Sequence, residues 1–212
     1  PSLAGRKVTF TPPPLDHVQF SPEGESARSR YELRPEVKVV TVIGKLSKNR
    51  GFEEAIQTFA QLRKRVDCRM MIIGHGEHRR SLEALAKSVR VAADVIWAGY
   101  HEDDLAEHYR ASDVLLFTAR GSDEGHRAII EAMACGVPVA TFPLEGVSAL
   151  VPPDWIAAAA TPDALAVTAA ALLSADRHEL WGDAFRRSLP FGYAAAAKRL
   201  IERYESLERF EA

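Results

Sequence analysis

The chain has 212 residues, of which 47% are hydrophobic and 26% are charged. This composition supplies enough apolar side chains for one large domain with a substantial core, and it argues against disorder. The formal net charge is −2, from 29 acidic and 27 basic residues. A chain so close to neutrality is not expected to bind nucleic acid through general electrostatic attraction.

Cysteine usage and hydropathy favour a cytoplasmic protein. The two cysteines, Cys68 and Cys135, are too few for a disulfide scaffold, and we expect each to be a small buried hydrophobe. No apolar run approaches the roughly 20 residues that a membrane-spanning helix needs, and the first residues lack the organisation of a signal peptide. Because the chain begins at Pro1 rather than at Met, we expect either that it is part of a longer protein or that a leader has been removed from it.

Residues 1–36 are rich in proline and charge, which predicts a linker with one short extended piece at residues 7–11. From residue 37 onward, apolar runs alternate with helical patterns, as is typical of a parallel sheet built from βαβ units. We predict strands at residues 37–43, 69–73, 94–97, 114–117 and 137–141, separated by helices at residues 52–65, 79–89, 102–110 and 124–135.

The strands are apolar throughout rather than alternating, so we expect all five to be buried in a doubly wound, Rossmann-like α/β sheet with helices on both faces. Alanine-rich segments then predict helices at residues 162–173, 177–188 and 193–210. The result is a single domain with an amino-terminal linker and a helical carboxy-terminal extension. Ligands of such sheets bind beyond the carboxyl ends of the strands.

The most informative segment runs from Gly121 to Ala140, where an acidic loop leads into a helix with a second carboxylate. Asp123 and Glu131 are eight residues apart, or roughly 12 Å along a helix, and lie near one face. One carboxylate could reach a sugar and the other a ribose, while free N–H groups at residues 124–127 could hold a diphosphate. Equally, Asp123, Arg127 and Glu131 could form a solvated ladder of charges.

Two basic side chains, Lys45 and Arg50, follow the first predicted strand in the loop that begins at Gly44. Two cations at the carboxyl edge of the sheet could neutralise a leaving diphosphate. In isolation, an ordinary solvated basic turn explains the same residues.

The next two strands end in glycines, at Gly74 and Gly76 and then at Gly99, which is followed by Tyr100. Glycine there either lets a ligand come close to the backbone or simply allows the turn, and Tyr100 either borders a base or caps the core. His75 and His78 have no carboxylate or cysteine spaced to complete a metal site with them, so no metal is predicted. The sequence also lacks the nucleophile elbow, the Walker phosphate loop and the dinucleotide glycine pattern.

Taken in order, these segments closely resemble the carboxy-terminal domain of retaining GT-B type glycosyltransferases of the group-one family. The resemblance includes the Ala132-Met-Ala-Cys-Gly-Val-Pro-Val139 sequence after the acidic segment, and residues 7–22 are similar to the family's interdomain segment. It implies three parts: an interdomain linker at residues 1–36, a donor-binding domain at residues 37–190, and a helix at residues 191–212 that packs on an absent amino-terminal domain.

The resemblance also implies roles for individual residues. Lys45 and Arg50 correspond to the family's basic pair, which contacts the donor diphosphate and stabilises the departing nucleotide. Glu131 corresponds to the ribose ligand and Asp123 to the sugar ligand. The residues expected near the sugar are Glu124, Gly125, His126 and Arg127, and those near the base or phosphate are Gly44, Gly74, Gly76, Gly99 and Tyr100.

Some positions depart from the family pattern. The first acid is aspartate instead of the commoner glutamate, and Glu124 beside it could supply the sugar contact instead. The order of the basic pair is inverted, which alters the hydrogen-bond geometry. The loop at residues 144–149 also lacks the family's two glycines and proline–glutamate pair, which leaves Ala149 where a glutamate is usual.

The function that the resemblance implies is transfer of a hexose from a nucleoside diphosphate sugar to an acceptor, with the anomeric configuration retained and without a metal or other cofactor. The expected partners are the nucleotide sugar and the absent amino-terminal acceptor domain, with peripheral membrane contact through that missing half. We expect this chain alone to bind donor weakly and to be inactive. The alternatives are a non-catalytic nucleotide-sugar-binding or scaffold module, and an epimerase or phosphorylase of the same two-domain plan.

Overall fold

The computed structural model describes residues 14–119 and 123–208, without the side chains of residues 123–125, 203 and 205–208. The described residues contain a five-stranded sheet in the order β3-β2-β1-β4-β5, and each neighbouring pair is parallel. The strands are β1 (Lys38–Ile43), β2 (Cys68–Ile73), β3 (Val95–Gly99), β4 (Val114–Phe117) and β5 (Val139–Thr141). The strand order reverses between β1 and β4, which makes this a doubly wound sheet with its ligand crevice at that point.

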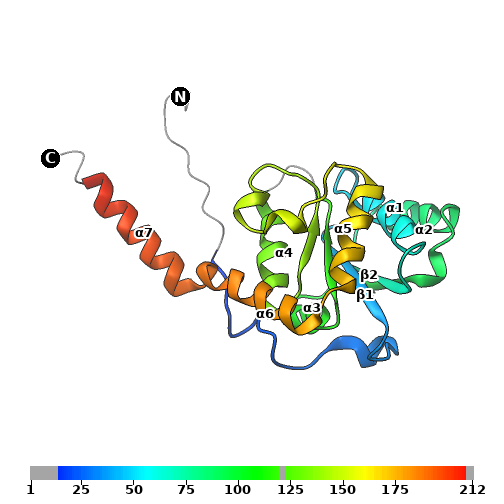
Figure 1. Cartoon of the computed structure of the whole chain (residues 1–212), viewed down its shortest axis with the longest axis horizontal. Coiled ribbons are helices and arrows are strands. Elements are labelled where there is room, and N and C mark those ends of the chain that lie inside the picture. The colour runs from blue at the N-terminus through cyan, green and yellow to red at the C-terminus, as the bar shows by residue number, and fades with distance from the viewer. Residues whose placement is uncertain (1–13, 120–122, 209–212) are drawn as a thin grey trace.

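Helices cover both faces of the sheet (Figure 1). The α-helices are α1 (Phe52–Leu62), α2 (Arg79–Ser88), α3 (Leu105–Arg110), α4 (Asp123–Ala134), α5 (Pro162–Ser174), α6 (Arg177–Ser188) and α7 (Tyr193–Glu208). Helix α1 packs against α2 and α5 on one side, and α4 packs against α3 and α6 on the other. Short 3-10 turns lie at η1 (Ala27–Tyr31), η2 (Ala92–Asp94), η3 (Val147–Ala149), η4 (Pro153–Trp155) and η5 (Leu189–Phe191).

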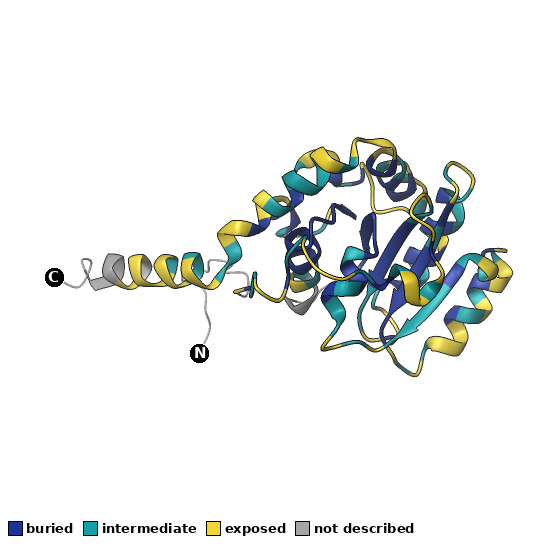
Figure 2. Ribbon diagram, turned by 90° about the horizontal axis from the view of Figure 1, so that it is seen from below, coloured by how far each residue is buried: buried dark blue, intermediate teal, exposed yellow. Residues whose placement is uncertain are grey.

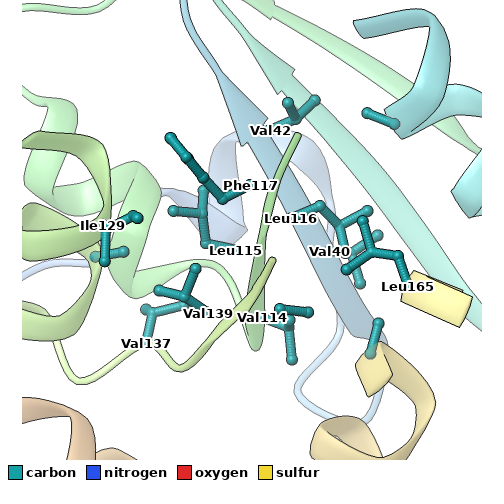
Figure 3. Close-up of a cluster of buried hydrophobic side chains, with 14 of the residues drawn as sticks. Val40, Val42, Val114, Leu115, Leu116, Phe117, Ile129, Val137, Val139 and Leu165 are labelled. Carbon is teal, nitrogen blue, oxygen red and sulfur yellow. The ribbon is translucent and has the colours of Figure 1, made fainter. Parts of the chain in front are cut away.

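Both faces of the central strands are buried, as the apolar runs predict. Successive side chains of β4 point to opposite sides of the sheet (Figure 3). Leu115 and Phe117 point toward Ile129 on α4, whereas Leu116 points toward Leu165 on α5. The doubly wound α/β fold expected from the sequence is therefore confirmed.

The prediction that all five strands are buried is wrong for β3. Only Val95 of this strand is buried, and its other residues are partly exposed. Strand β3 lies at one edge of the sheet with β2 as its main neighbour, whereas β5 at the other edge is buried because α5 and η4 also pack against it. The helix expected at residues 102–110 is also shorter, because α3 begins at Leu105.

Asp113 joins three segments beneath the start of β4. Its Oδ2 accepts a hydrogen bond of 2.8 Å from the backbone N–H of Val39 and lies 3.5 Å from Nη1 of Arg28. Its Oδ1 lies 3.5 Å from Nε of Arg177, whose guanidinium stacks over the ring of Trp181 at 3.9 Å. Partial burial lowers the pKa of Arg177, and the nearby carboxylate of Asp113 opposes that shift.

Residues 14–36 pack against the surface of the domain. Leu15, Phe20 and Leu33 are buried, and Leu15 forms an isolated parallel bridge with Gly192. The extended piece expected at residues 7–11 lies outside the described residues. Where the linker ends and the domain begins stays a prediction.

Helix α7 projects away from the body of the molecule, and most of its described side chains are exposed (Figure 2). Its exposed apolar side chains include Tyr193, Leu200, Ile201 and Tyr204. Within residues 14–119 and 123–208, no helix is both long enough and apolar enough to cross a membrane.

Both cysteines are buried and free, as predicted. Burial raises the pKa of the Cys68 thiol and of the Cys135 thiol to about 12. Neither thiol is therefore ionised near neutral pH, and neither is a reactive nucleophile.

Candidate functional site

A cavity of about 290 Å³ opens at the carboxyl ends of β1 and β4, where the strand order reverses. This is the position at which doubly wound sheets bind their ligands. Its charged lining comes from two segments that are distant in the sequence, the loop after β1 and helix α4. The lining residues include Lys45, Arg50, Tyr109, Phe117, Arg127 and Glu131.

The basic loop after β1 is held by its own backbone. Leu46 is fully buried, its N–H donates to the carbonyl of His75 at 2.9 Å, and its carbonyl accepts from the N–H of His78 at 3.0 Å. Lys45 is exposed beside this anchor, and Arg50 is partly buried. Since both line the same cavity, the structure brings the two predicted cations to one place.

Two of the predicted glycines are needed for the close approach of backbone to backbone. A Cβ on Gly74, whose φ is +139°, would lie 1.9 Å from the carbonyl oxygen of Gly44. A Cβ on Gly76 would lie 2.1 Å from the carbonyl oxygen of Leu46. Both distances are far below van der Waals contact, so any side chain here would push the basic loop away from the end of β2.

Glu131 is the buried acid of the cavity, with 6% of its surface exposed. Its Oε1 accepts a hydrogen bond of 2.7 Å from Nε of Arg127, and its Oε2 accepts one of 3.0 Å from the hydroxyl of Tyr109. Burial raises the pKa of the Glu131 carboxyl, and the two donors oppose that shift. An ion pair with Arg127 therefore exists, but a carboxylate this deeply buried does not belong to a solvated ladder.

Tyr109 is the residue at this site that the sequence analysis missed. It lies on α3, is fully buried, and reaches Glu131 across 22 residues of sequence. A tyrosine on the inner face of a helix usually finds a partner for its hydroxyl, so its type and position were a usable signal. The sequence did not say which partner that would be.

A second cavity of about 580 Å³ adjoins the first and extends to the ends of β2 and β3. Gly44, Lys45, Arg127 and Glu131 line both cavities. Among the residues that line only the larger one are Phe20, Gly74, His75, Tyr100, His101 and Glu102.

Tyr100 does not cap the core, because it is 59% exposed. Its hydroxyl donates to Glu102 at 2.8 Å, and its ring meets His75 edge-on with the ring centroids 4.9 Å apart. It therefore stands at the mouth of the larger cavity, as a residue bordering a flat ligand would.

The other predicted site residues either line neither cavity or lie outside what the structure describes. Gly76 and Gly99 line neither cavity. The ring of His126 lies 6.2 Å from that of Phe117, at the end of β4. The side chains of Asp123 and Glu124, and the surroundings of Gly125, lie outside what the structure describes.

One group in the described part of the chain has the composition of a metal site: His101, Asp104 and His108. Its nitrogens already have hydrogen-bond partners. His101 contacts Asp104 Oδ1 at 2.9 Å and the Ala98 carbonyl at 3.0 Å, and His108 contacts the Tyr31 hydroxyl at 2.9 Å. The two imidazole rings also lie against each other, with centroids 3.7 Å apart and an angle of 31° between their planes. The geometry suits a polar network that ties η1 to α3 better than a metal centre.

Comparison with known proteins identifies relatives of this chain. A sequence model of the family described as glycosyl transferases group 1 matches residues 37–175. A GDP-mannose-dependent alpha-(1-6)-phosphatidylinositol monomannoside mannosyltransferase from Mycolicibacterium smegmatis is 33% identical over 141 residues, which cover 60% of this chain and 36% of that protein.

Two solved structures share the fold. Sucrose-phosphate synthase from Thermosynechococcus elongatus has a TM-score of 0.76 at 22% identity, over 93% of this chain and 52% of that one. HepE from Anabaena, in complex with UDP and glucose, also has a TM-score of 0.76, at 18% identity, over 91% of this chain and 55% of that one. The chain therefore spans about a third of the mannosyltransferase and about half of each solved protein.

Proposed function

Because the chain belongs to the group 1 family of glycosyl transferases, we propose that it is the donor-binding half of a retaining enzyme that transfers a hexose from a nucleoside diphosphate sugar to an acceptor. The observation that carries this proposal is the cavity between β1 and β4. Two cations from one loop and one buried carboxylate from α4 meet there, at the strand ends where such sheets bind ligands.

In this proposal each group has one task. Lys45 and Arg50 bind the diphosphate and offset the negative charge that develops as the nucleotide leaves. The free N–H groups at the start of α4 bind the same phosphates. Glu131 accepts hydrogen bonds from the ribose hydroxyls. Asp123 or Glu124 contacts the donor sugar, and no metal or other cofactor takes part.

The larger cavity would then hold the nucleoside. Its volume of about 580 Å³ lies within the range of small-molecule sites, and Tyr100 at its mouth offers a flat surface to a base. HepE, which shares this fold, is bound to UDP and glucose, and the mannosyltransferase relative is named for its dependence on GDP-mannose. Both UDP and GDP are therefore the ligands to test.

We also propose that the acceptor site lies on an amino-terminal domain outside this chain and that α7 packs against it. The exposed apolar side chains of α7, among them Leu200 and Ile201, support this partner. Because half of the cleft would then be missing, the chain alone binds donor weakly and transfers no sugar. Transfer at a substantial rate by the isolated chain would contradict this part of the proposal.

Titration of the chain with UDP, GDP and their sugar conjugates tests the binding site, with NMR as the readout because it detects weak binding. Glu131→Ala should weaken nucleotide binding by at least tenfold. The matched control is Glu83→Ala: Glu83 also pairs with an arginine four residues before it, at 2.9 Å, but on the exposed surface of α2. Binding that is absent, or indifferent to Glu131→Ala, would favour a non-catalytic scaffold.

The reaction itself needs the complete polypeptide. Assays for transfer, epimerisation and phosphorolysis with the sugar nucleotide that binds best should detect transfer alone. The anomeric proton of the product, followed by NMR from the first turnovers, should show the configuration of the donor. An inverted anomer would refute the retaining mechanism while leaving the donor site intact.

A further inference from the structure

The carboxylate of Glu131, the proposed ribose ligand, is held in one orientation by hydrogen bonds from two side chains. We propose that Tyr109 is a positioning residue, whose hydroxyl holds the Glu131 carboxylate in the orientation that binds the vicinal diol of a ribonucleotide. This inference rests on the proposed function, because it assumes that a nucleoside diphosphate occupies the cavity. It adds a residue, a contact and a measurable preference for ribose hydroxyls.

The two donors to Glu131 differ in how firmly they are held. Arg127 donates to Oε1 at 2.7 Å, but 58% of its side chain is exposed. Water or a ligand phosphate can therefore compete with Glu131 for this guanidinium. Tyr109 reaches Oε2 at 3.0 Å from a fully buried position. A buried hydroxyl has few alternative partners, so this bond fixes the plane of the carboxylate.

The position of Tyr109 is itself fixed by packing. Its ring meets that of Phe20 at an angle of 64° with the centroids 6.2 Å apart, and Phe20 is also buried. Helix α3, which carries Tyr109, packs directly against α4, which carries Glu131. The hydroxyl therefore cannot follow the carboxylate if it turns away, and it acts as a fixed donor.

Electrostatics keep this hydroxyl a donor. Burial raises the pKa of Tyr109 well above its ordinary range, and the negative charge of Glu131 raises it further. The phenol stays protonated at neutral pH, so it donates to the carboxylate. An ionised carboxylate has about four acceptor positions, and Tyr109 and Arg127 use two of them. The two that remain are the number that a 2′,3′-diol requires.

Without the Tyr109 hydroxyl, Arg127 would be the remaining side-chain donor to Glu131 in the described part of the site. The carboxylate would then turn toward an exposed cation, and its free acceptor positions would no longer face the ribose. Only ligands with ribose hydroxyls would be affected. A dideoxynucleotide makes no contact with Glu131 and would bind Tyr109→Phe as it binds the wild type.

The test compares UDP and GDP with their 2′,3′-dideoxy counterparts by NMR titration of the wild type and Tyr109→Phe. The wild type should prefer the ribonucleotide by about tenfold or more, and Tyr109→Phe should reduce that preference by roughly fivefold with unchanged dideoxy affinity. The matched control is Tyr31→Phe, which removes a hydroxyl that contacts His108 on the same helix and not Glu131. It should keep the full preference.

A double-mutant cycle separates positioning from a general structural role. In a Glu131→Gln background, Tyr109→Phe should produce a much smaller further loss of ribose preference, because the two side chains act through one contact. Equal losses for ribo and dideoxy ligands, or additive losses in the cycle, would overturn the inference while the proposed function stands. Wild-type protein that binds no nucleoside diphosphate would overturn both.

Discussion

Replacing Glu131 with glutamine should change ligand binding and folding stability in opposite directions. The substitution keeps the shape of the side chain and removes the charge, but it replaces one carboxylate oxygen with an amide nitrogen that cannot accept a hydrogen bond. The remaining oxygen can still accept from Arg127, and the amide N–H can donate to the hydroxyl of Tyr109. A hydrogen bond to a charged acceptor contributes about 1 kcal/mol more than one to a neutral acceptor. Two ribose hydroxyls would then lose about 2 kcal/mol, so the affinity for a ribonucleotide should fall by about 30-fold.

The effect on stability has the other sign. Burial of Glu131, which is 6% exposed, raises the pKa of its carboxyl, so its ionised form is disfavoured in the fold at neutral pH. Glutamine removes that cost. The lost ion pair involves Arg127, which is mostly exposed, so it contributes little in water. Glu131→Gln should therefore unfold at the wild-type temperature or above it.

The pH dependence follows from the same shift. A carboxyl whose folded pKa is raised stabilises the fold at pH values below its unfolded pKa, and this stabilisation is lost as the pH rises through the folded pKa. The wild type should thus lose stability relative to Glu131→Gln as the pH rises above about 4, the ordinary pKa of a glutamate. The groups that face Glu131 are present in both proteins, so their contributions that do not involve residue 131 cancel in the comparison. They are Arg127, Tyr109 and Cys135, with the cavity cations Lys45 and Arg50.

The measurements are thermal unfolding by circular dichroism across this pH range and NMR titration with UDP and GDP. A fall in unfolding temperature of several degrees, parallel to the loss of affinity, would show that Glu131 serves the fold instead of the ligand. Unchanged affinity for both nucleotides would show that the carboxylate does not contact them. Either result would refute the reasoning.

Three further predictions follow from contacts already described. Lys45→Met should weaken UDP or GDP binding by about tenfold and leave the nucleoside unaffected, as titration with both will show. Gly74→Ala should cost about 3 kcal/mol or more in a denaturant titration, because its Cβ meets a backbone oxygen at 1.9 Å, whereas Gly99→Ala enters open space and should cost about 1–2 kcal/mol. Asp113→Ala leaves two partly buried arginines without their shared acid and should cost about 3 kcal/mol; a neutral result would show that these ion pairs do not stabilise the fold.

The sequence alone determined the order of the elements and their approximate limits. Apolar runs such as that of β4 and the helical pattern of α4 depend on neighbours close in the chain, so local periodicity was enough to find them. The parallel arrangement also followed, since each strand is separated from the next by a helix. Because parallel strands end at one edge, Lys45, Arg50 and Glu131 were predicted together, and the cavity brings them together.

Only the tertiary structure decided which strands are exposed and how the site at the carboxyl ends of the strands is built. The exposure of β3 depends on which elements pack around its edge of the sheet, which no local pattern reveals, since β5 at the other edge is buried. The contact between Tyr109 and Glu131 depends on how α3 packs against α4, and the pKa shift of Glu131 depends on how much water that packing excludes. Spacing along one helix could not separate a solvated ladder from a buried acid, because burial is set by the elements that pack on top of it.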